Sequence, residues 1–288
     1  MSTLHCLPRP RSHGPVVVCL HCSSSSGRQW RALTAPLAQQ FDFRTPDLLG
    51  YDAPGNWPTG ARVSLDDEAD RLSELLVDAE APVHLLGHSY GGAVALQMSL
   101  RWPGRVASMT LYEPVRFGLL FGASTAGAGE AAQTVEARYQ IVTIGNRFAL
   151  AVMSGRLDEA AAMFVDYWGG HGTWAAMDPR RRHLQAALMP KVNAEFQSLF
   201  SDRVPAPVYE SLTMPVHLIG GTSSPLPARM VMRLLATRIP KISTVTVVGL
   251  NHMAPVSAAD RVRAQLPDWL QPGESMPGLA RAAELAAA

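Results

Sequence analysis

Short apolar runs alternate with longer segments of helical spacing in the first and last thirds of the chain. The apolar runs are four or five residues long and rich in valine, isoleucine and leucine, as expected of strands buried in a parallel sheet: residues 16–20, 83–86, 109–112, 216–219 and 244–248. The segments with apolar residues at helical spacing are 66–76, 93–102, 228–238 and 258–270. This repetition predicts an α/β fold with a mostly parallel sheet flanked by helices.

The middle of the chain breaks this rhythm. We find no buried strand between about residues 114 and 210, where 130–153, 157–168 and 180–200 have helical patterns. We therefore expect a core formed by 1–113 and 211–271, an inserted helical cap at 114–210, and a tail at 272–288 to which we assign no chemistry. Open α/β sheets bind ligands at the carboxyl ends of their strands. We expect the cap to cover that edge, with Trp168 among the side chains that line an apolar substrate pocket.

Composition narrows the class of protein. The chain has 288 residues, of which 47% are hydrophobic and 17% charged, and a net charge of +1. This balance suits one sizeable buried core and excludes the basic footprint of a nucleic-acid-binding protein. Its three cysteines lack the spacing of a disulfide framework. No secretory signal is evident, and no apolar run approaches the roughly 20 residues that span a bilayer. We expect a cytoplasmic protein without nucleic-acid or membrane partners, and the sequence leaves its oligomeric state open.

One serine stands in a motif for nucleophilic attack. Ser89 lies in Gly87-His88-Ser89-Tyr90-Gly91, after an apolar run and before an alanine-rich segment. Between a strand and a helix, a G-x-S-x-G motif forms a sharp turn that exposes the serine hydroxyl. Small residues two before and two after the serine let the chain pass itself without a clash. The letters alone also fit an ordinary glycine-rich turn, so the rest of the chain has to supply partners.

A serine nucleophile needs a base that takes its proton. In proteins with this turn, the histidine comes last in the chain. His252 follows the apolar run 244–248 and lies in the loop 249–255, at the carboxyl end of a predicted strand. The alternative is a loop histidine that makes only a structural hydrogen bond. The presence of Ser89 favours the catalytic role.

The acid that orients the histidine is not in its usual place. The loop 220–226, after the preceding strand, holds no carboxylate, and no Asp or Glu occurs from residue 211 to 259. Glu113 is the main candidate, because it ends the apolar run that follows the nucleophile's helix. Asp202 and Glu210 are weaker candidates. A serine–histidine dyad without an acid is the remaining alternative.

Two backbone N–H groups should stabilise the developing oxyanion. One is expected from Tyr90, directly after the nucleophile, and the other from the serine-rich loop 21–27, where Ser23 is our choice. This loop also fits an ordinary polar turn. We expect substrate contacts from Cys22, Ser24 and Met253.

Taken together, these motifs resemble those of the alpha/beta hydrolase superfamily, in its helically capped branch. The resemblance covers nearly all of residues 16–270 and rests on Leu20-His21-Cys22, on Asp47-Leu48-Leu49-Gly50-Tyr51-Asp52, on the Ser89 turn and on the loop 249–255. The superfamily often has glycine where this chain has Cys22. The shifted acid is similar to the arrangement in some haloalkane dehalogenases. Those enzymes and the related epoxide hydrolases use an aspartate nucleophile, so the resemblance does not imply either activity here.

The sequence therefore predicts a serine hydrolase that cleaves an ester or related acyl bond of a medium-sized, mostly apolar small molecule. The reaction would run through an acyl-enzyme and require neither cofactor nor metal. A carbon–carbon bond hydrolase, a lactonase or a perhydrolase with the same residues is an alternative within enzymes. A small-molecule receptor on the same fold, with little turnover, is the alternative outside them.

Overall fold

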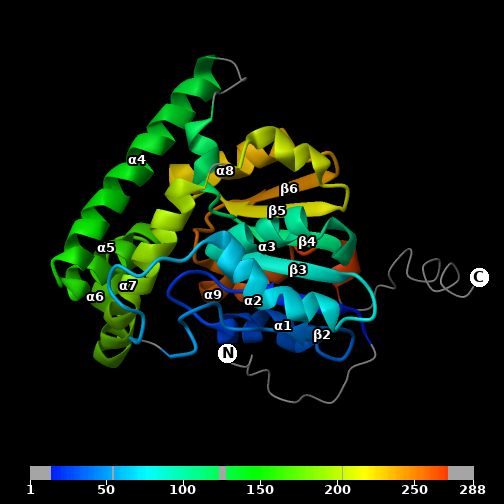
Figure 1. Cartoon of the computed structure of the whole chain (residues 1–288), viewed down its shortest axis with the longest axis horizontal. Coiled ribbons are helices and arrows are strands. Elements are labelled where there is room, and N and C mark those ends of the chain that lie inside the picture. Colours follow the sequence, from blue (N-terminus) through cyan, green and yellow to red (C-terminus); the bar gives the residue numbers. More distant parts are fainter. Residues whose placement is uncertain (1–13, 54, 123–127, 203, 272–288) are drawn as a thin grey trace, which may run out of the picture.

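The computed structural model describes residues 14–53, 55–122, 128–202 and 204–271, so the predicted tail at 272–288 lies outside the described residues. Within this part, six parallel strands form one sheet in the order β2-β1-β3-β4-β5-β6 (Figure 1). The strands are β1 Val16–Leu20, β2 Asp42–Arg44, β3 Val83–His88, β4 Val106–Tyr112, β5 Val216–Gly221 and β6 Ile242–Val247. The α/β fold with a parallel sheet is confirmed.

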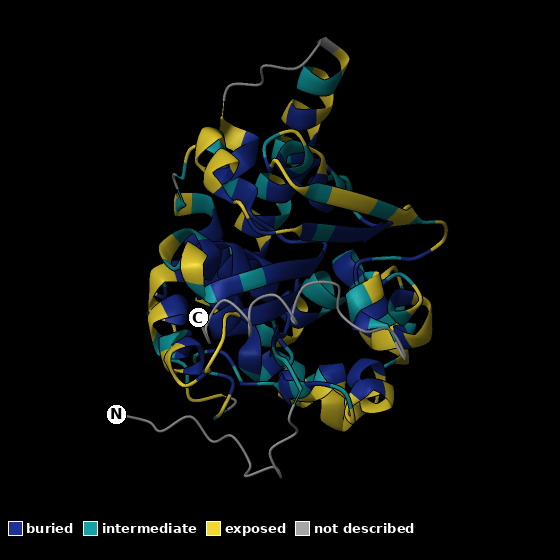
Figure 2. Ribbon diagram, turned by 90° about the vertical axis from the view of Figure 1, so that its right-hand side faces the viewer, coloured by how far each residue is buried: buried dark blue, intermediate teal, exposed yellow. Residues whose placement is uncertain are grey.

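Helices cover both faces of the sheet, as the continuous apolar strands require. In β1, Val18 and Leu20 pack into one hydrophobic cluster, while Val17 and Cys19 pack into another on the opposite face. The first cluster includes residues of helices α2 (Leu65–Val77), α3 (Tyr90–Arg101) and α8 (Leu226–Ala236). The second includes residues of α1 (Arg31–Thr34), α9 (Ala254–Ser257) and α10 (Ala259–Arg263). Figure 2 shows this burial, with the central strands largely in dark blue, the edge strand β6 in teal and yellow, and helices that carry yellow outer faces.

Between β4 and β5 the described residues form helices and no strand. They are α4 Ala128–Met153, α5 Leu157–Gly169, α6 Thr173–Ala176 and α7 Pro179–Ser201, with short 3-10 turns at Phe117–Phe121 and Ala206–Ser211. We call α4 to α7 the helical insertion. Its members pack on one another and lie together at one end of the sheet, drawn in green on the left of Figure 1.

A buried ion pair ties the two ends of the helical insertion to the core. Arg116, before its first turn, binds both carboxylate oxygens of Asp202, which follows α7. The same guanidinium donates to the side chain of Gln97 and to the carbonyl of Ala93, both in α3. Arg116 is 1% exposed. Because the guanidinium is buried and each of its three nitrogens donates a hydrogen bond, both crossings between core and insertion are held against the nucleophile's helix.

Strand β2 and the segment 258–270 differ from the sequence prediction. Strand β2 was not predicted, because its three residues alternate polar and apolar at the edge of the described sheet and only Phe43 is buried. The single helix expected over 258–270 is wrong. The chain there forms the short helix α10 and a separate 3-10 turn, Asp268–Leu270. Pro267 lacks an N–H donor and disfavours helical backbone in the residue before it, so a continuous helix cannot pass this point.

Candidate active site

Strand register brings the serine and the glutamate to the same level of the sheet. Ser89 is the first residue after β3 and Glu113 the first after β4, and the last residues of these strands, His88 and Tyr112, are register partners. The N–H of Ser89 donates to the carbonyl of Tyr112 at 3.0 Å, and the N–H of Glu113 donates to the carbonyl of Ile219 at 3.0 Å. Both side chains therefore start from neighbouring carboxyl ends of the parallel sheet.

Backbone strain in the described residues concentrates at this edge. Three non-glycine residues there have positive φ, namely Ser24 at 58°, Ser89 at 55° and Glu113 at 44°. L-amino acids avoid this region, and such strain persists where the surrounding structure imposes it, often at functional sites. Steric crowding at the same edge also explains why position 91 is a glycine. A Cβ there would lie 2.2 Å from the carbonyl oxygen of Leu20, so the turn leaves no room for a side chain.

The three side chains join in a hydrogen-bonded relay. Nε2 of His252 lies 2.8 Å from Oγ of Ser89, and Nδ1 lies 2.7 Å from Oε2 of Glu113. Because a carboxylate only accepts, Nδ1–H donates to Glu113, and Nε2 accepts the hydrogen bond of the Ser89 hydroxyl. Oε1 of Glu113 accepts the N–H of Gly221 at 2.7 Å, so both carboxylate oxygens are engaged. Ser89, His252 and Glu113 are 6%, 2% and 0% exposed, which shields the relay from water.

His88, inside the serine motif, supports the histidine loop. Its Nε2–H donates to the carbonyl of His252 at 2.8 Å, and its Nδ1 faces Nε2 of Gln29 at 3.3 Å. Burial, together with the neighbouring His252, holds the pKa of His88 well below its ordinary value. His88 therefore stays neutral, with one ring nitrogen donating and the other accepting.

One backbone N–H group of the first loop is free to act as an oxyanion donor, whereas others in the loop already have hydrogen-bond partners within the described residues. Within the described part of the chain, the backbone N–H groups of Ser23 and Tyr90 have no hydrogen-bond partner, as donors to an oxyanion must. The N–H of Cys22 instead donates to Oε1 of Gln29 at 3.1 Å. Burial raises the pKa of the Cys22 thiol to about 12, so it stays protonated. The Ser24 hydroxyl donates to Oε1 of Gln185 at 2.6 Å.

The helical insertion contacts the histidine loop directly. The ring of Trp168, in α5, lies 4.3 Å from the imidazole of His252, centroid to centroid. Nδ2 of Asn251 donates to the carbonyl of Gly169 at 2.9 Å. Met253 is half-buried and packs against the main hydrophobic cluster. Substrate contacts by Cys22, Ser24, Trp168 and Met253 stay predictions.

The weaker acid candidates lie in other interactions. Asp202 pairs with the buried Arg116, and Glu210 pairs with Arg238 at 2.9 Å. Neither carboxylate is recorded in contact with His252, whose Nδ1 is occupied by Glu113. Among the carboxylates named from the sequence, geometry therefore favours Glu113 alone.

Sequence reasoning missed several polar side chains around the relay. Besides His88 and Gln29, they are Tyr51, Glu68, Gln185, Lys191 and Glu195, which join the first loop to α2 and α7. One signal was present, because Lys191 is one of only two lysines in the chain and stands four residues before Glu195 in an otherwise largely buried helical turn. Spacing of this kind usually indicates a surface ion pair, so it did not indicate a buried one.

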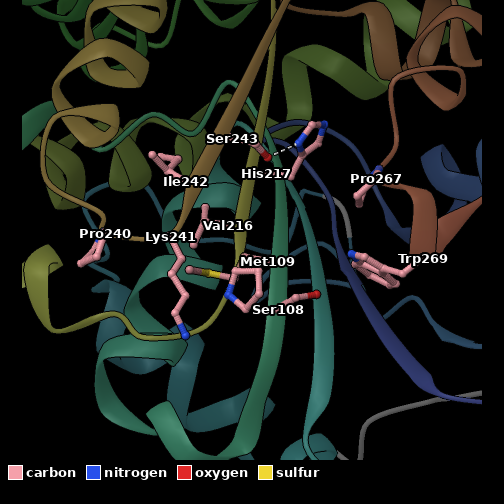
Figure 3. Close-up of a pocket in the computed structure, with 11 residues that line it drawn as sticks. Ser108, Met109, Val216, His217, Pro240, Lys241, Ile242, Ser243, Pro267 and Trp269 are labelled. Atoms are coloured by element: carbon pink, nitrogen blue, oxygen red, sulfur yellow. Dashed lines mark hydrogen bonds between the residues drawn. The ribbon is translucent and has the colours of Figure 1, made fainter. Parts of the chain in front are cut away.

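A surface pocket lies at the opposite edge of the sheet. It has a volume of about 340 Å³ and is lined by Val216 and Ile242, the first residues of β5 and β6, by Met109, the register partner of Val216 in β4, and by Trp269 (Figure 3). Its histidine, His217, is engaged by Oγ of Ser243 at 2.7 Å and by the carbonyl of Gln265 at 2.8 Å. Ser243 and His217 form a serine–histidine pair here, but the lining residues include no carboxylate to orient the imidazole, unlike the group formed by Ser89, His252 and Glu113 at the carboxyl edge.

No group of three or more His, Cys, Asp or Glu side chains is arranged to hold a metal ion in the described part of the protein. No described helix combines the length and the apolar character needed to cross a membrane.

Comparison with known proteins places this chain in a family. A segment is 35% identical over 103 residues to Lipase LipV of Mycobacterium tuberculosis, covering 35% of this chain and only 38% of that protein. The Magnesium-chelatase 30 kDa subunit of Rhodobacter capsulatus is 25% identical over 266 residues, which is 90% of this chain and 87% of that protein. The structure of the esterase RhEst1 from Rhodococcus sp. ECU1013 superposes with a TM-score of 0.66 at 21% identity, over 90% of this chain and 91% of that one, and shows the shared fold. The model of the alpha/beta hydrolase family matches residues 17–265, so this chain belongs to the alpha/beta hydrolase family.

Proposed function

We propose that this protein is a serine hydrolase that cleaves an ester or related acyl bond of a small molecule. One observation carries the proposal, namely the relay from Oγ of Ser89 through His252 to Glu113, at distances of 2.8 and 2.7 Å. This is the arrangement of a nucleophile, a general base and an orienting acid. The names of related proteins, a lipase and an esterase among them, agree with ester chemistry.

In the proposed reaction, Oγ of Ser89 attacks the substrate carbonyl carbon while its proton passes to Nε2 of His252. The negative oxygen of the tetrahedral intermediate accepts hydrogen bonds from the N–H groups of Tyr90 and Ser23. His252 then gives its proton to the leaving alcohol oxygen, and the carbon–oxygen bond breaks. Water repeats the sequence on the acyl-enzyme, so the acid is released and Ser89 regains its proton. Glu113 holds the imidazole ring in position and stabilises its positive charge.

We propose that the helical insertion acts as a cap that selects an apolar substrate. Trp168 lies over His252, and Phe117 stacks on Trp168 with ring centroids 6.4 Å apart and planes 11° from parallel. The ring of Phe196, in α7, also lies near Phe117, with centroids 6.3 Å apart. An aromatic wall next to the nucleophile favours an uncharged acyl group of medium size.

The first test is hydrolysis of p-nitrophenyl esters of increasing acyl length. We expect the wild-type protein to turn over, and Ser89→Ala and His252→Ala to lower kcat by about 10⁴-fold or more, because removing the nucleophile or the base abolishes the acyl-enzyme route. Ser73→Ala, which removes an exposed hydroxyl from α2, is the matched control and should keep wild-type rates. The preferred acyl length then gives the size of acyl group that the site accepts.

A labelling experiment with a fluorophosphonate probe separates hydrolysis from binding alone. Covalent modification of Ser89 accompanied by ester turnover supports the hydrolase. Modification without turnover on any ester would point to a receptor that keeps a reactive serine. If the probe does not modify Ser89 and no ester is turned over, the proposal is overturned.

A further inference from the structure

A charged cluster is buried between the core and the helical insertion. Nζ of Lys191, in α7, lies 3.0 Å from Oε1 of Glu68 in α2 and 2.8 Å from Oε1 of Glu195, one turn further along α7. All three side chains are at most 1% exposed. Burial opposes the charge on Lys191, but the two carboxylates outweigh it and raise its pKa above the ordinary value. The cluster is therefore one ammonium held between two carboxylates.

Burying such a cluster is a weak way to stabilise a protein. Removing charges from water costs several kcal/mol per ion, and well-packed apolar side chains of similar volume often serve stability equally well. The rings of Tyr51, Trp57 and Tyr90 also surround the ammonium, at 5.1 to 5.3 Å from their centroids. Tyr90 directly follows the nucleophile, so the cluster lies beneath the reactive turn. The arrangement instead fixes the direction of the hydrogen bonds around it, because an ammonium can only donate and a carboxylate can only accept.

Tyr51 links the cluster to the first loop through its hydroxyl group. Its hydroxyl lies 2.8 Å from Oε1 of Glu195 and 2.8 Å from the backbone nitrogen of Ser24. The carboxylate has no proton to give, so the tyrosine O–H donates to Glu195 and its lone pair faces the N–H of Ser24. Burial raises the pKa of Tyr51 well above its ordinary value, so the hydroxyl keeps its proton.

Ser24 is held at every polar group. Its N–H meets Tyr51, its hydroxyl donates to Oε1 of Gln185 at 2.6 Å, and its carbonyl accepts from Nε2 of Gln185 at 3.1 Å. Gln185 belongs to α7, like Lys191 and Glu195. The positive φ of Ser24, 58°, is a strained conformation that these contacts can maintain. The preceding residue is Ser23, the proposed oxyanion donor.

We propose that Tyr51, Gln185 and the Glu68–Lys191–Glu195 cluster are positioning residues that hold the loop around Ser23 and Ser24 in its oxyanion-binding conformation. The inference rests on the proposed function for its catalytic consequence. It makes the oxyanion hole depend on where helix α7 of the insertion lies.

The test replaces Tyr51 by phenylalanine, which removes one oxygen atom and leaves the three charged residues in place. Tyr209→Phe is the matched control, because Tyr209 is a fully buried tyrosine whose hydroxyl has no partner among the described residues. We expect hydrogen exchange in peptides covering residues 22–26 to rise by about tenfold in Tyr51→Phe, the equivalent of one lost hydrogen bond. We expect kcat on the best ester to fall by about 10- to 100-fold with KM changed by less than about twofold, because the loss lies in the transition state. Tyr209→Phe should leave the exchange of this loop and kcat unchanged.

A second variant, Gln185→Ala, keeps the proposal testable if Tyr51→Phe does not fold. It releases the hydroxyl and carbonyl of Ser24, and we expect the same local rise in exchange and the same loss in kcat. Exchange in residues 22–26 that stays as in the control overturns the proposal, whatever happens to the rate. Faster loop exchange with an unchanged kcat overturns its catalytic part. If the wild type hydrolyses no ester, the proposed function fails, and the exchange measurement alone still decides whether these residues hold the loop.

Discussion

At the scale of single residues, Glu113 shows how one side chain does two things at once. Its Oε2 accepts from the imidazole of His252, while its Oε1 accepts the backbone N–H of Gly221 at the end of β5. Both oxygens must act as acceptors, which a carboxylate does and an amide cannot. The residue therefore orients the histidine and is itself oriented by the neighbouring strand.

Glu113→Gln should expose this requirement. The amide can place its oxygen against only one of the two donors, so its NH2 group faces either Nδ1–H or the N–H of Gly221. We expect His252 to leave the tautomer that carries its proton on Nδ1, and kcat on an ester to fall by about 10³- to 10⁴-fold. Steady-state kinetics with the ester preferred by the wild type measure the change.

The control for this charge removal is Glu210→Gln, at an exposed carboxylate paired with Arg238. It should change kcat by less than about twofold, since exposed pairs of this kind contribute little. A Glu113→Gln protein within tenfold of the wild type would mean that another group orients His252.

At the scale of elements, the reactive turn depends on how closely α3 approaches β1. The first turn of α3 passes the carbonyl groups at the end of β1 so tightly that only glycine fits at position 91. The same approach brings the N-terminus of α3 beside the first loop. The two candidate oxyanion donors, Tyr90 in α3 and Ser23 in the first loop, therefore lie close to each other. Close packing of a helix on a strand thus builds the site as well as the core.

Gly91→Ala should separate these elements. The added methyl group would lie 2.2 Å from the Leu20 carbonyl oxygen and 2.5 Å from that of His21, both backbone atoms that cannot rotate away. We expect the free energy of unfolding to fall by about 3 kcal/mol, which lowers the thermal midpoint by roughly 6–12 °C, and ester hydrolysis to be lost with it. Gly104→Ala, where the new methyl group meets nothing within 4 Å, is the control and should melt within a few degrees of the wild type. Equal melting of the two variants would contradict this account.

At the scale of the whole molecule, buried neutral histidines link stability to pH. Burial lowers the pKa of His21, His84 and His88, and for His84 the pKa falls to about 4. Nε2 of His21 accepts the N–H of Leu48 at 3.0 Å, a bond that protonation of the ring would break. In the unfolded chain these histidines take up protons near pH 6.5, whereas the folded protein resists protonation until lower pH. Stability is therefore lost as the pH falls below about 6.5.

Urea unfolding between pH 7.5 and pH 5 measures this loss. For His84 alone, the 1.5 pH units between 6.5 and 5 correspond to about 2 kcal/mol of unfolding free energy. His84→Phe keeps an aromatic ring against Trp269, on which His84 stacks at 4.2 Å, and removes the titrating group. We expect the decrease between the two pH values to be smaller by about 2 kcal/mol in this variant. An identical decrease would show that His84 does not titrate between the folded and unfolded states.

The sequence by itself determined the parts that local pattern controls. Apolar runs and helical spacing predicted five of the strands and the helical insertion, because burial on both faces dictates those residues wherever they occur. The Ser89 turn, the late His252 and the missing carboxylate at 220–226 together indicated which three side chains the structure joins by hydrogen bonds. Glu113 could be named because it directly follows the strand next to the nucleophile's strand, and neighbouring parallel strands end at the same edge of the sheet.

Only the tertiary structure decided what distant segments do to each other. Lys191 and Glu195 look like a surface pair along the chain, and Glu68 like part of an acidic first turn. Their charges act together because the side chain of Lys191 in α7 reaches Glu68 in α2, and Tyr51 links Glu195 to the first loop. Strand β2 and the break before Asp268 also depend on neighbours and on a proline more than on periodicity. Periodicity reports which face of an element is buried, whereas the partner that buries it is set by packing across the whole molecule.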